Sequence, residues 1–315
     1  MSVMNSMIRA DGSPAYAMTA MLSGAVINIV LDPIFIFVLK WGIAGAAWAT
    51  IIGQVVSLLV CAVYFRKPKT FRLSKGSFLP DGPVLRQIIA LGGSTFITQL
   101  SIVALSLVSN ITLARFGALS QYGPDIPISV FSIQTKVYTV VCNIVVGIVL
   151  GGQPIFGYNY GAGKMDRVRQ AYKLVLRATL IVGLAATLIF QLCPLLVINI
   201  FGAGDGLYQE FAIKTFRIYL SLTVITCTVK MTTVFFQAIG KPVNAMIASL
   251  SRDLLCFTPL ALTLPAWLEE TGSGRGIDGI LYAAPISDLV ALVTILCLTV
   301  PFFRKIKGNG RLTPQ

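Results

Sequence analysis

Eight long apolar runs limit what this sequence can fold into. A transmembrane α-helix needs about 20 consecutive, mostly apolar residues, and such runs lie at 17–39, 43–65, 84–114, 127–153, 173–200, 214–237, 243–266 and 277–302. With 56% apolar and only 12% charged residues, the 315-residue chain is too apolar for a water-soluble domain. The runs predict an all-α, polytopic transmembrane helix bundle of about eight spans.

The basic residues indicate how these spans are oriented. The net charge is +13. Positive side chains follow the second, fourth, sixth and eighth spans, at Arg66, Lys67, Lys69, Arg72 and Lys75, at Lys164, Arg167, Arg169 and Lys173, at Lys241, and at Arg304, Lys305, Lys307 and Arg311. Cytoplasmic loops carry an excess of Lys and Arg. The pattern predicts a multi-pass protein of a plasma (inner) membrane with both termini cytoplasmic, and it explains the basic excess without nucleic acid as a partner.

Two pairs of segments indicate an internal repeat. GSPAYAM at 12–18 resembles GKPVNAM at 240–246, and GIAGAAWA at 42–49 resembles GIDGILYA at 276–283. The offsets of the two pairs nearly agree, which indicates a duplicated helix bundle, as in many secondary transporters. Four further spans precede the second copy, whereas sixteen residues precede the first apolar run. The chain is therefore expected to lack helices that a complete transporter has.

A carboxylate within the first span is a candidate cation ligand. Asp32 lies deep in the run, and Asn28 lies one helical turn before it, so the two side chains share a helix face. A charge is costly in lipid, so intramembrane carboxylates are functional candidates. Pro33 frees the carbonyl of Ile29 and is expected to kink the helix, and Thr50 adds a hydroxyl. These oxygens suit Na⁺, and a buried carboxylate alone suits H⁺; the alternative is an Asp-Pro pair that only bends the helix.

Polar and charged side chains in the later spans are candidates for a substrate cavity. They are Gln99, Gln134, Lys136, Lys230 and Asp288. The alternatives are interhelical hydrogen bonds for the neutral side chains and, for the lysines, stems that extend to the membrane interface. Arg252 and Asp253 are adjacent in the seventh span, so they are expected to point to different helix faces and not to bond each other. Pro154 predicts a kinked, broken helix that runs into a cytoplasmic turn.

Enzymatic functions are disfavoured by what the chain contains. It has no histidine, so it has neither a Ser-His pair nor a histidine zinc site. The Gly-rich segment before Lys164 departs from a phosphate loop because Met165 stands where Ser or Thr is required. Its six cysteines lie in apolar runs without CxxC spacing, which predicts buried side chains and not a disulfide framework. We expect no enzyme activity, no cofactor, and no metal beyond Na⁺ as a coupling ion.

Several of these segments resemble one transporter family. GGQPIFGYNYGA with Arg167-Val168 downstream, NIVLDPIFI followed by GIAGAAWAT, FQAIGKP and APISD are similar to the multidrug and toxic compound extrusion (MATE) family, notably its bacterial multidrug branch, over essentially the whole chain. The resemblance implies twelve helices in two six-helix lobes. It also implies an antiporter that exports cationic or amphipathic drugs and xenobiotics in exchange for H⁺ or Na⁺.

For this sequence, the resemblance implies the last eight of the twelve helices. Residues 1–65 would form the remainder of the N-lobe, with the end of helix 4 and helices 5 and 6. Residues 66–83 would be a basic cytoplasmic linker, 84–302 the C-lobe with helices 7 to 12, and 303–315 a cytoplasmic tail. Asn28, Asp32 and Thr50 would belong to the family's N-lobe cation site, which an aspartate on the absent first helix completes.

Two other interpretations remain. A lipid-linked oligosaccharide flippase of the same superfamily would have a similar number of helices and a basic cavity, for which Lys136 and Lys230 are the candidates. A truncated remnant would insert into the membrane and transport nothing.

Overall fold

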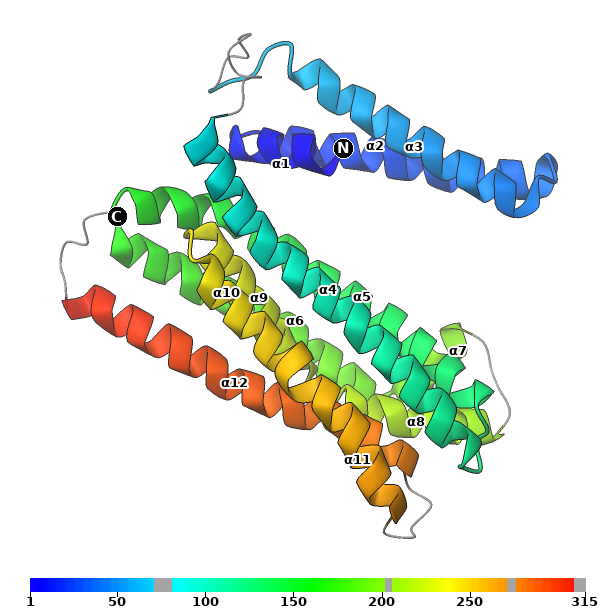
Figure 1. The fold of residues 1–315 in the computed structure, drawn as a ribbon. Coiled ribbons are helices and arrows are strands. Elements are labelled where there is room, and N and C mark those ends of the chain that lie inside the picture. Colours follow the sequence, from blue (N-terminus) through cyan, green and yellow to red (C-terminus); the bar gives the residue numbers. More distant parts are fainter. Residues whose placement is uncertain (71–80, 202–205, 271–275, 309–315) are drawn as a thin grey trace. The chain divides into compact units, whose positions relative to one another are not determined.

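The computed structural model describes residues 1–70, 81–201, 206–270 and 276–308, and every regular element in these ranges is a helix (Figure 1). The chain divides into two compact units, Met1–Asp81 and Gly82–Gln315. The predicted linker at 66–83 and the predicted tail at 303–315 fall partly outside the described residues. The assignment of the two units to the two lobes of a transporter stays a prediction.

The first unit is a helical hairpin with a short leading helix. Helix α1 (Ser2–Ala10) precedes α2 (Pro14–Pro33), which continues as a π-helix, η1 (Ile34–Val38), and α3 (Gly42–Tyr64) packs along α2. Small residues set this close approach, because a methyl group at Gly53 would lie 2.6 Å from the carbonyl oxygen of Gly24. The contact fixes which side chains of α2 and α3 face each other.

A carboxylate outside the spans joins the beginning and the end of this unit. Asp11, in the turn between α1 and α2, is 2% exposed. It accepts hydrogen bonds from the Tyr64 hydroxyl at 2.6 Å and from the Lys69 and Thr70 amides at 2.8 and 2.7 Å. Burial alone raises the pKa of Asp11, but these bonds and one from the Thr70 hydroxyl together lower it well below its usual range. The sequence pattern had given Asp11 no role.

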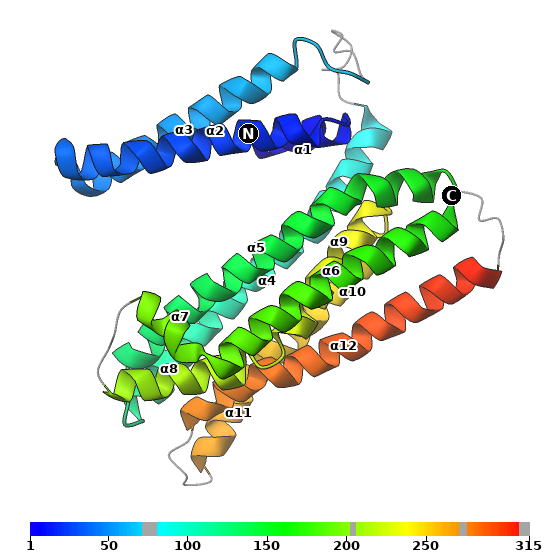
Figure 2. The ribbon, with the colours of Figure 1, turned by 180° about the vertical axis from the view of Figure 1, so that it is seen from behind.

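The second unit is a bundle of helical hairpins (Figures 1 and 2). Its elements are α4 (Gly82–Ala118), α5 (Asp125–Gly161), α6 (Met165–Leu192), α7 (Pro194–Ile200), α8 (Gly206–Tyr219), α9 (Thr223–Ala238), α10 (Pro242–Leu250), the π-helix η3 (Ser251–Phe257), α11 (Thr258–Glu270) and α12 (Gly276–Gly308). Helix α5 packs against α6, α8 and α9, and α12 packs against α4, α8, α9 and α11. Aromatic side chains such as Phe156, Phe211, Phe216, Phe235 and Phe257 are fully buried between them.

The number of spans confirms the sequence prediction. Within the described ranges, seven helical segments are long and apolar enough to cross a membrane, and a bent pair raises the number to as many as eight. That pair is α8 and α9, which meet at 51° where one continuous span was predicted. The predicted span at 173–200 is also divided, because α6 ends at Leu192 and Pro194, which has no amide hydrogen, starts α7.

The predicted break at Pro154 is wrong, since α5 remains helical to Gly161. Membrane helices often accommodate an internal proline.

The two copies of the first repeated segment have the same backbone hydrogen bonds. In the α1–α2 turn and in the α9–α10 turn, the amides of Ser13 and Lys241 each donate to the carbonyl five residues earlier, at 3.1 and 2.9 Å. Each bond spans a glycine with positive φ, Gly12 at 76° and Gly240 at 74°. This is the Schellman motif, which closes a helix C-terminus with a left-handed residue. The segments at 12–18 and 240–246 resemble each other because they form the same corner between two helices.

The other repeated segment places a glycine where two helices cross. It begins α3 and α12, and its second glycine is Gly45 in one copy and Gly279 in the other. A Cβ at Gly45 would lie 2.9 Å from the backbone of Phe35, and a Cβ at Gly279 would lie 2.5 Å from the nitrogen of Pro265. Both hairpins therefore depend on a residue without a side chain.

We expect Gly279→Ala to lower the thermal unfolding midpoint of the purified chain in detergent. The added methyl group meets backbone atoms that cannot move aside, and overpacking costs about 1–3 kcal/mol. Gly147→Ala, in α5, is the matched control, because a Cβ there meets nothing within 4 Å. Equal midpoints for the two variants would contradict the close crossing of α11 and α12.

We expect Asp11→Asn to lower the unfolding midpoint at neutral pH. A carboxyl whose pKa is lowered in the folded state contributes stability that is fully present above its unfolded pKa, about 3.9. That contribution declines as the pH falls below the unfolded pKa and is lost completely once the pH has fallen through the lowered, folded-state pKa. The difference in midpoint between Asp11→Asn and the parent chain should thus be constant above about pH 5 and should shrink below about pH 4. A difference that grows on acidification would show that Asp11 is not stabilised as the carboxylate.

Candidate functional site

Asn28, Asp32 and Thr50 lie together in the first unit. The Nδ2 atom of Asn28 is 3.4 Å from Oδ1 of Asp32 and 3.4 Å from Oγ1 of Thr50. The four-residue spacing stacks Asn28 and Asp32 on one face of α2. The close approach of α2 and α3 at Gly24 and Gly53 brings Thr50 next to them. The structure thus brings together the three residues that the sequence selected, and their binding of a cation stays a prediction.

The chemistry of these three side chains fits a small cation. Their contacts are longer than the roughly 2.7–3.2 Å of ordinary N–H···O bonds, and no Lys or Arg of the described residues pairs with Asp32. Rotation of the Asn28 amide by half a turn would present its oxygen beside the carboxylate and the Thr50 hydroxyl, which is an all-oxygen set. The described ranges contain no group of three His, Cys, Asp or Glu side chains that could hold a metal ion. An ion at this position would therefore depend on neutral oxygens around one carboxylate.

The backbone changes geometry immediately after Asp32. Pro33 is the last residue of α2, and in η1 the Leu39 amide donates to the Ile34 carbonyl, five residues earlier, at 2.9 Å. Proline leaves the Ile29 carbonyl without its usual donor, and π-helical turns within helices are frequent at functional positions. The predicted kink at Pro33 is thus accompanied by a local departure from α-helical geometry.

A cavity of about 420 Å³ lies within the second unit, between α4, α5, the α8–α9 pair and η3. Gln99, Gln134 and Lys230, three of the residues predicted to line a cavity, do line this one. Gln134 is 1% exposed, and its Oε1 has no hydrogen-bond partner among the described residues. Buried acceptors are normally satisfied, so this oxygen is available to a ligand. Lys136 is not among the lining residues and is exposed.

A buried cluster of charges forms part of the cavity wall. The Nε atom of Arg252 is 2.5 Å from Oδ1 of Asp288, and its Nη1 is 2.7 Å from Oδ1 of Asp253. Thr226 donates its hydroxyl to Asp288 at 2.9 Å. Arg252 and Asp253 line the cavity, whereas Asp288 does not line it and pairs with the Nε atom of Arg252. Asp288, predicted to line a substrate cavity, is therefore the ion-pair partner of a buried arginine.

The prediction that Arg252 and Asp253 would not bond each other is wrong. Both lie in η3, whose wider π-helical turn differs from the α-helical geometry on which the prediction rested. Three charges in low dielectric are tolerated because the arginine is paired with both carboxylates. An adjacent Arg and Asp inside an apolar run indicated a buried charged group in the sequence. The prediction of their geometry failed because it assumed an α-helix where the structure has a π-helix.

Aromatic rings that sequence reasoning missed also line the cavity. The rings of Phe131 and Tyr219 meet edge to face with their centroids 5.7 Å apart, and Tyr219 contacts Phe257 at 6.0 Å. Aromatic faces attract apolar and cationic groups. An aromatic residue in an apolar run gives no sign of whether it faces lipid, protein or a cavity, so these two could not have been selected from the sequence.

Curated proteins similar to this chain are multidrug exporters. The multidrug export protein MepA of Staphylococcus haemolyticus (strain JCSC1435) is 28% identical over 318 residues, which is 99% of this chain and 64% of that protein. MepA of Staphylococcus aureus (strain MSSA476) is 26% identical over 306 residues, with 93% and 62% covered. The chain thus spans less than two thirds of the length of these relatives.

Solved structures share the fold. A MATE protein in its straight conformation superposes with a TM-score of 0.84 at 24% identity, covering 98% of this chain and 66% of that one. A MOP superfamily transporter from Pyrococcus furiosus gives a TM-score of 0.83 at 24% identity, covering 97% and 66%. The model of the MatE family matches residues 95–263, more than half of the chain. The resemblance seen in the sequence is thereby confirmed, and the chain belongs to the MATE family of multi-pass membrane transporters, which are not enzymes.

Proposed function

We propose that this chain acts in antiport across the plasma membrane, exporting cationic or amphipathic drugs in exchange for H⁺ or Na⁺. The cavity of the second unit carries the proposal. It lies among apolar membrane helices, it combines aromatic rings with a few polar groups, and it contains the unpartnered oxygen of Gln134. Ligand sites typically have such apolar walls with a small number of placed polar groups. The MepA relatives, named as multidrug export proteins, support this function.

The proposed coupling ion binds at Asp32. A ligand shifts a protein between two conformations only if it binds them with different affinity. Asn28 and Asp32 lie on α2 before η1, and Thr50 lies on α3 after it, so a movement of this irregular backbone would change the distances from Thr50 to the α2 pair. Ion binding that requires one set of distances would therefore favour one backbone arrangement.

The proposed orientation has both termini in the cytoplasm. Lys164 and Lys241 lie in the α5–α6 and α9–α10 turns, and Arg304 lies near the C-terminal end of α12. Figure 1 shows the α5–α6 turn, the α9–α10 turn and the C-terminal end of α12 at one end of the second unit. A basic end supports a cytoplasmic location by the positive-inside rule.

A second candidate is the flippase of a lipid-linked oligosaccharide, which one observation favours: Lys230 and Arg252 both line the cavity. The similar Pyrococcus furiosus transporter is described as having a binding pocket of reverse polarity that suggests a different function. Here Asp253 and Asp288 both pair with Arg252, so the charges of these two carboxylates, Arg252 and Lys230 sum to zero. We therefore retain drug export, and saturable ethidium binding separates the two candidates because the flippase would show none.

Asp32→Asn should abolish ion-coupled ethidium efflux from right-side-out membrane vesicles that contain this chain and are loaded with ethidium. The expected fall is at least about tenfold, because the lost carboxylate contributes at least about 1.4 kcal/mol to ion binding. Asp81→Asn, at an exposed position outside the spans, should transport like the parent chain. Gradient-dependent efflux by Asp32→Asn would reject Asp32 as the coupling site. Efflux by the parent chain no greater than that of empty vesicles would reject export by this chain.

Gln134→Leu should weaken ethidium binding to the purified chain by about two- to tenfold. This is the effect of one hydrogen bond of about 0.5–1.5 kcal/mol, and the unfolding midpoint should not fall because the change removes an unsatisfied buried acceptor. Ethidium fluorescence gives the affinity. Gln170→Leu, at an exposed position of α6 that does not line the cavity, is the matched control. Unchanged affinity in Gln134→Leu would exclude this oxygen from the drug site.

A further inference from the structure

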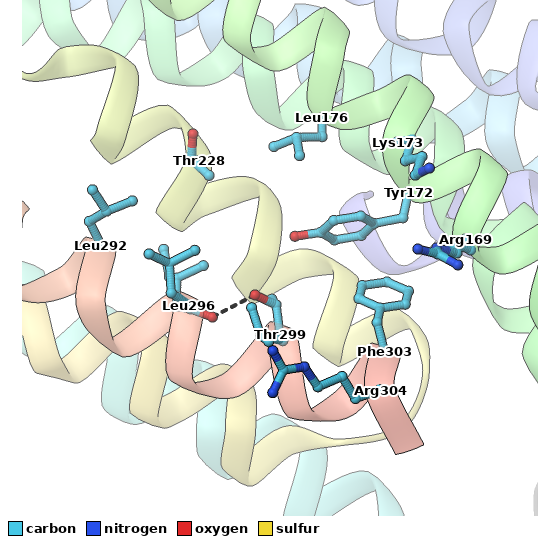
Figure 3. A pocket seen from close by; sticks show the side chains of 12 residues that line it. Arg169, Tyr172, Lys173, Leu176, Thr228, Leu292, Leu296, Thr299, Phe303 and Arg304 are labelled. Carbon is cyan, nitrogen blue, oxygen red and sulfur yellow. Dashed lines mark hydrogen bonds between the residues drawn. The ribbon is translucent and has the colours of Figure 1, made fainter. Parts of the chain in front are cut away.

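An open groove lies between α6 and α12 in the second unit. Both helices pack on α9, and the groove between them has a volume of about 520 Å³, within the roughly 300–1,000 Å³ of ligand sites. Figure 3 shows side chains from α6 and α12 on either side of it and Thr228 of α9 between them. The groove shares no lining residue with the cavity at Gln134.

Apolar side chains form the walls of this groove. Leu176, Leu296 and Val300 line it, and Leu296 and Val300 remain 50% and 42% exposed. The hydroxyls of Thr228 and Thr299 donate to carbonyls of their own helices at 2.9 and 2.7 Å. The walls therefore offer a ligand apolar surface and almost no free hydrogen-bond donors.

Three cations stand at one end of the groove. Arg169 and Lys173 lie one turn apart near the start of α6, and Arg304 lies near the end of α12 (Figure 3). At this end the rings of Tyr172 and Phe303 connect α6 and α12 with centroids 4.9 Å apart. Within the described ranges, none of the three cations forms an ion pair. The groove thus joins an uncompensated cationic end to an apolar body.

We propose that this groove binds an anionic phospholipid, with an acyl chain along the apolar walls and the phosphate held by Arg169, Lys173 and Arg304. The cations lie at the ends of membrane-spanning helices, where lipid headgroups are found. Basic pockets between such helices bind anionic headgroups, and guanidinium and ammonium groups donate to phosphate oxygens. The residues after Arg304 do not supply a negative charge that could neutralise these three cations, because they include Lys305, Lys307 and Arg311 and no acidic residue. This lipid site does not depend on the transport function proposed above.

Native mass spectrometry of the purified full chain in detergent tests the proposal, with phosphatidylglycerol as the probe and phosphatidylcholine as its uncharged counterpart. The parent chain should retain one phosphatidylglycerol in preference to phosphatidylcholine. Combined Arg169→Gln, Lys173→Gln and Arg304→Gln should weaken this binding by about fivefold for each cation removed, from the ~1 kcal/mol that a basic residue contributes near an anionic lipid. Leu296→Trp should also weaken it, because the larger side chain fills the groove while all three cations remain.

The matched control removes the same charge elsewhere. Combined Arg86→Gln, Lys164→Gln and Arg167→Gln changes three exposed positions that do not line the groove, and this variant should bind phosphatidylglycerol like the parent chain. Equal losses in the two triple variants would overturn the proposal, since binding would then follow net charge. Displacement of the lipid by an equal concentration of glycerol 3-phosphate would also overturn it, because the headgroup alone would then account for binding.

Discussion

The constraint on which this structure depends is that a chain in lipid must satisfy its own backbone hydrogen bonds. Helices do so within one segment, and the helix ends at Gly12, Gly163 and Gly240 are closed by bonds across a left-handed glycine. Two departures from α-helical geometry occur in the counterpart helices of the repeat, η1 after α2 and η3 after α10. Each lies beside ionisable groups, Asp32 in the first unit and the Arg252–Asp253 pair in the second.

These two sets of ionisable groups differ in how completely they are paired. Arg252 is bound by two carboxylates, and Thr226 donates a hydrogen bond to one of them, so every charge in this cluster has a partner and is fixed in place. Within the described ranges, Asp32 has one side-chain contact, with the neutral amide of Asn28 at 3.4 Å. A fully paired buried cluster stabilises one arrangement, whereas a carboxylate without a cation gains most from a bound ion. This difference is why we associate ion coupling with Asp32 and ligand binding with the cavity beside Arg252.

Short-range patterns were read correctly because they depend on neighbours along the chain. The spacing of Asn28 and Asp32, the repeated corners at Gly12 and Gly240 and the number of spans all follow from helical periodicity and turn chemistry. The errors at Pro154 and at the Arg252–Asp253 pair share one cause. Each assumed a local backbone rule, and packing within a membrane helix overrode it, by accommodating an internal proline in one case and a π-helical turn in the other.

The fold class, the repeat and the family resemblance could be predicted from the residues alone, because lipid demands long apolar helices whose length and corners are encoded locally. Which polar side chains lie around one cavity became clear from the folded arrangement of the helices. It grouped Gln99, Gln134 and Lys230 around one cavity and left Lys136 outside it. It also turned Arg169 and Arg304, basic residues that first indicated only topology, toward one groove. The physical reason is that the rotation of each helix about its axis is set by close crossings such as those at Gly53 and Gly279, and these join residues far apart in the chain.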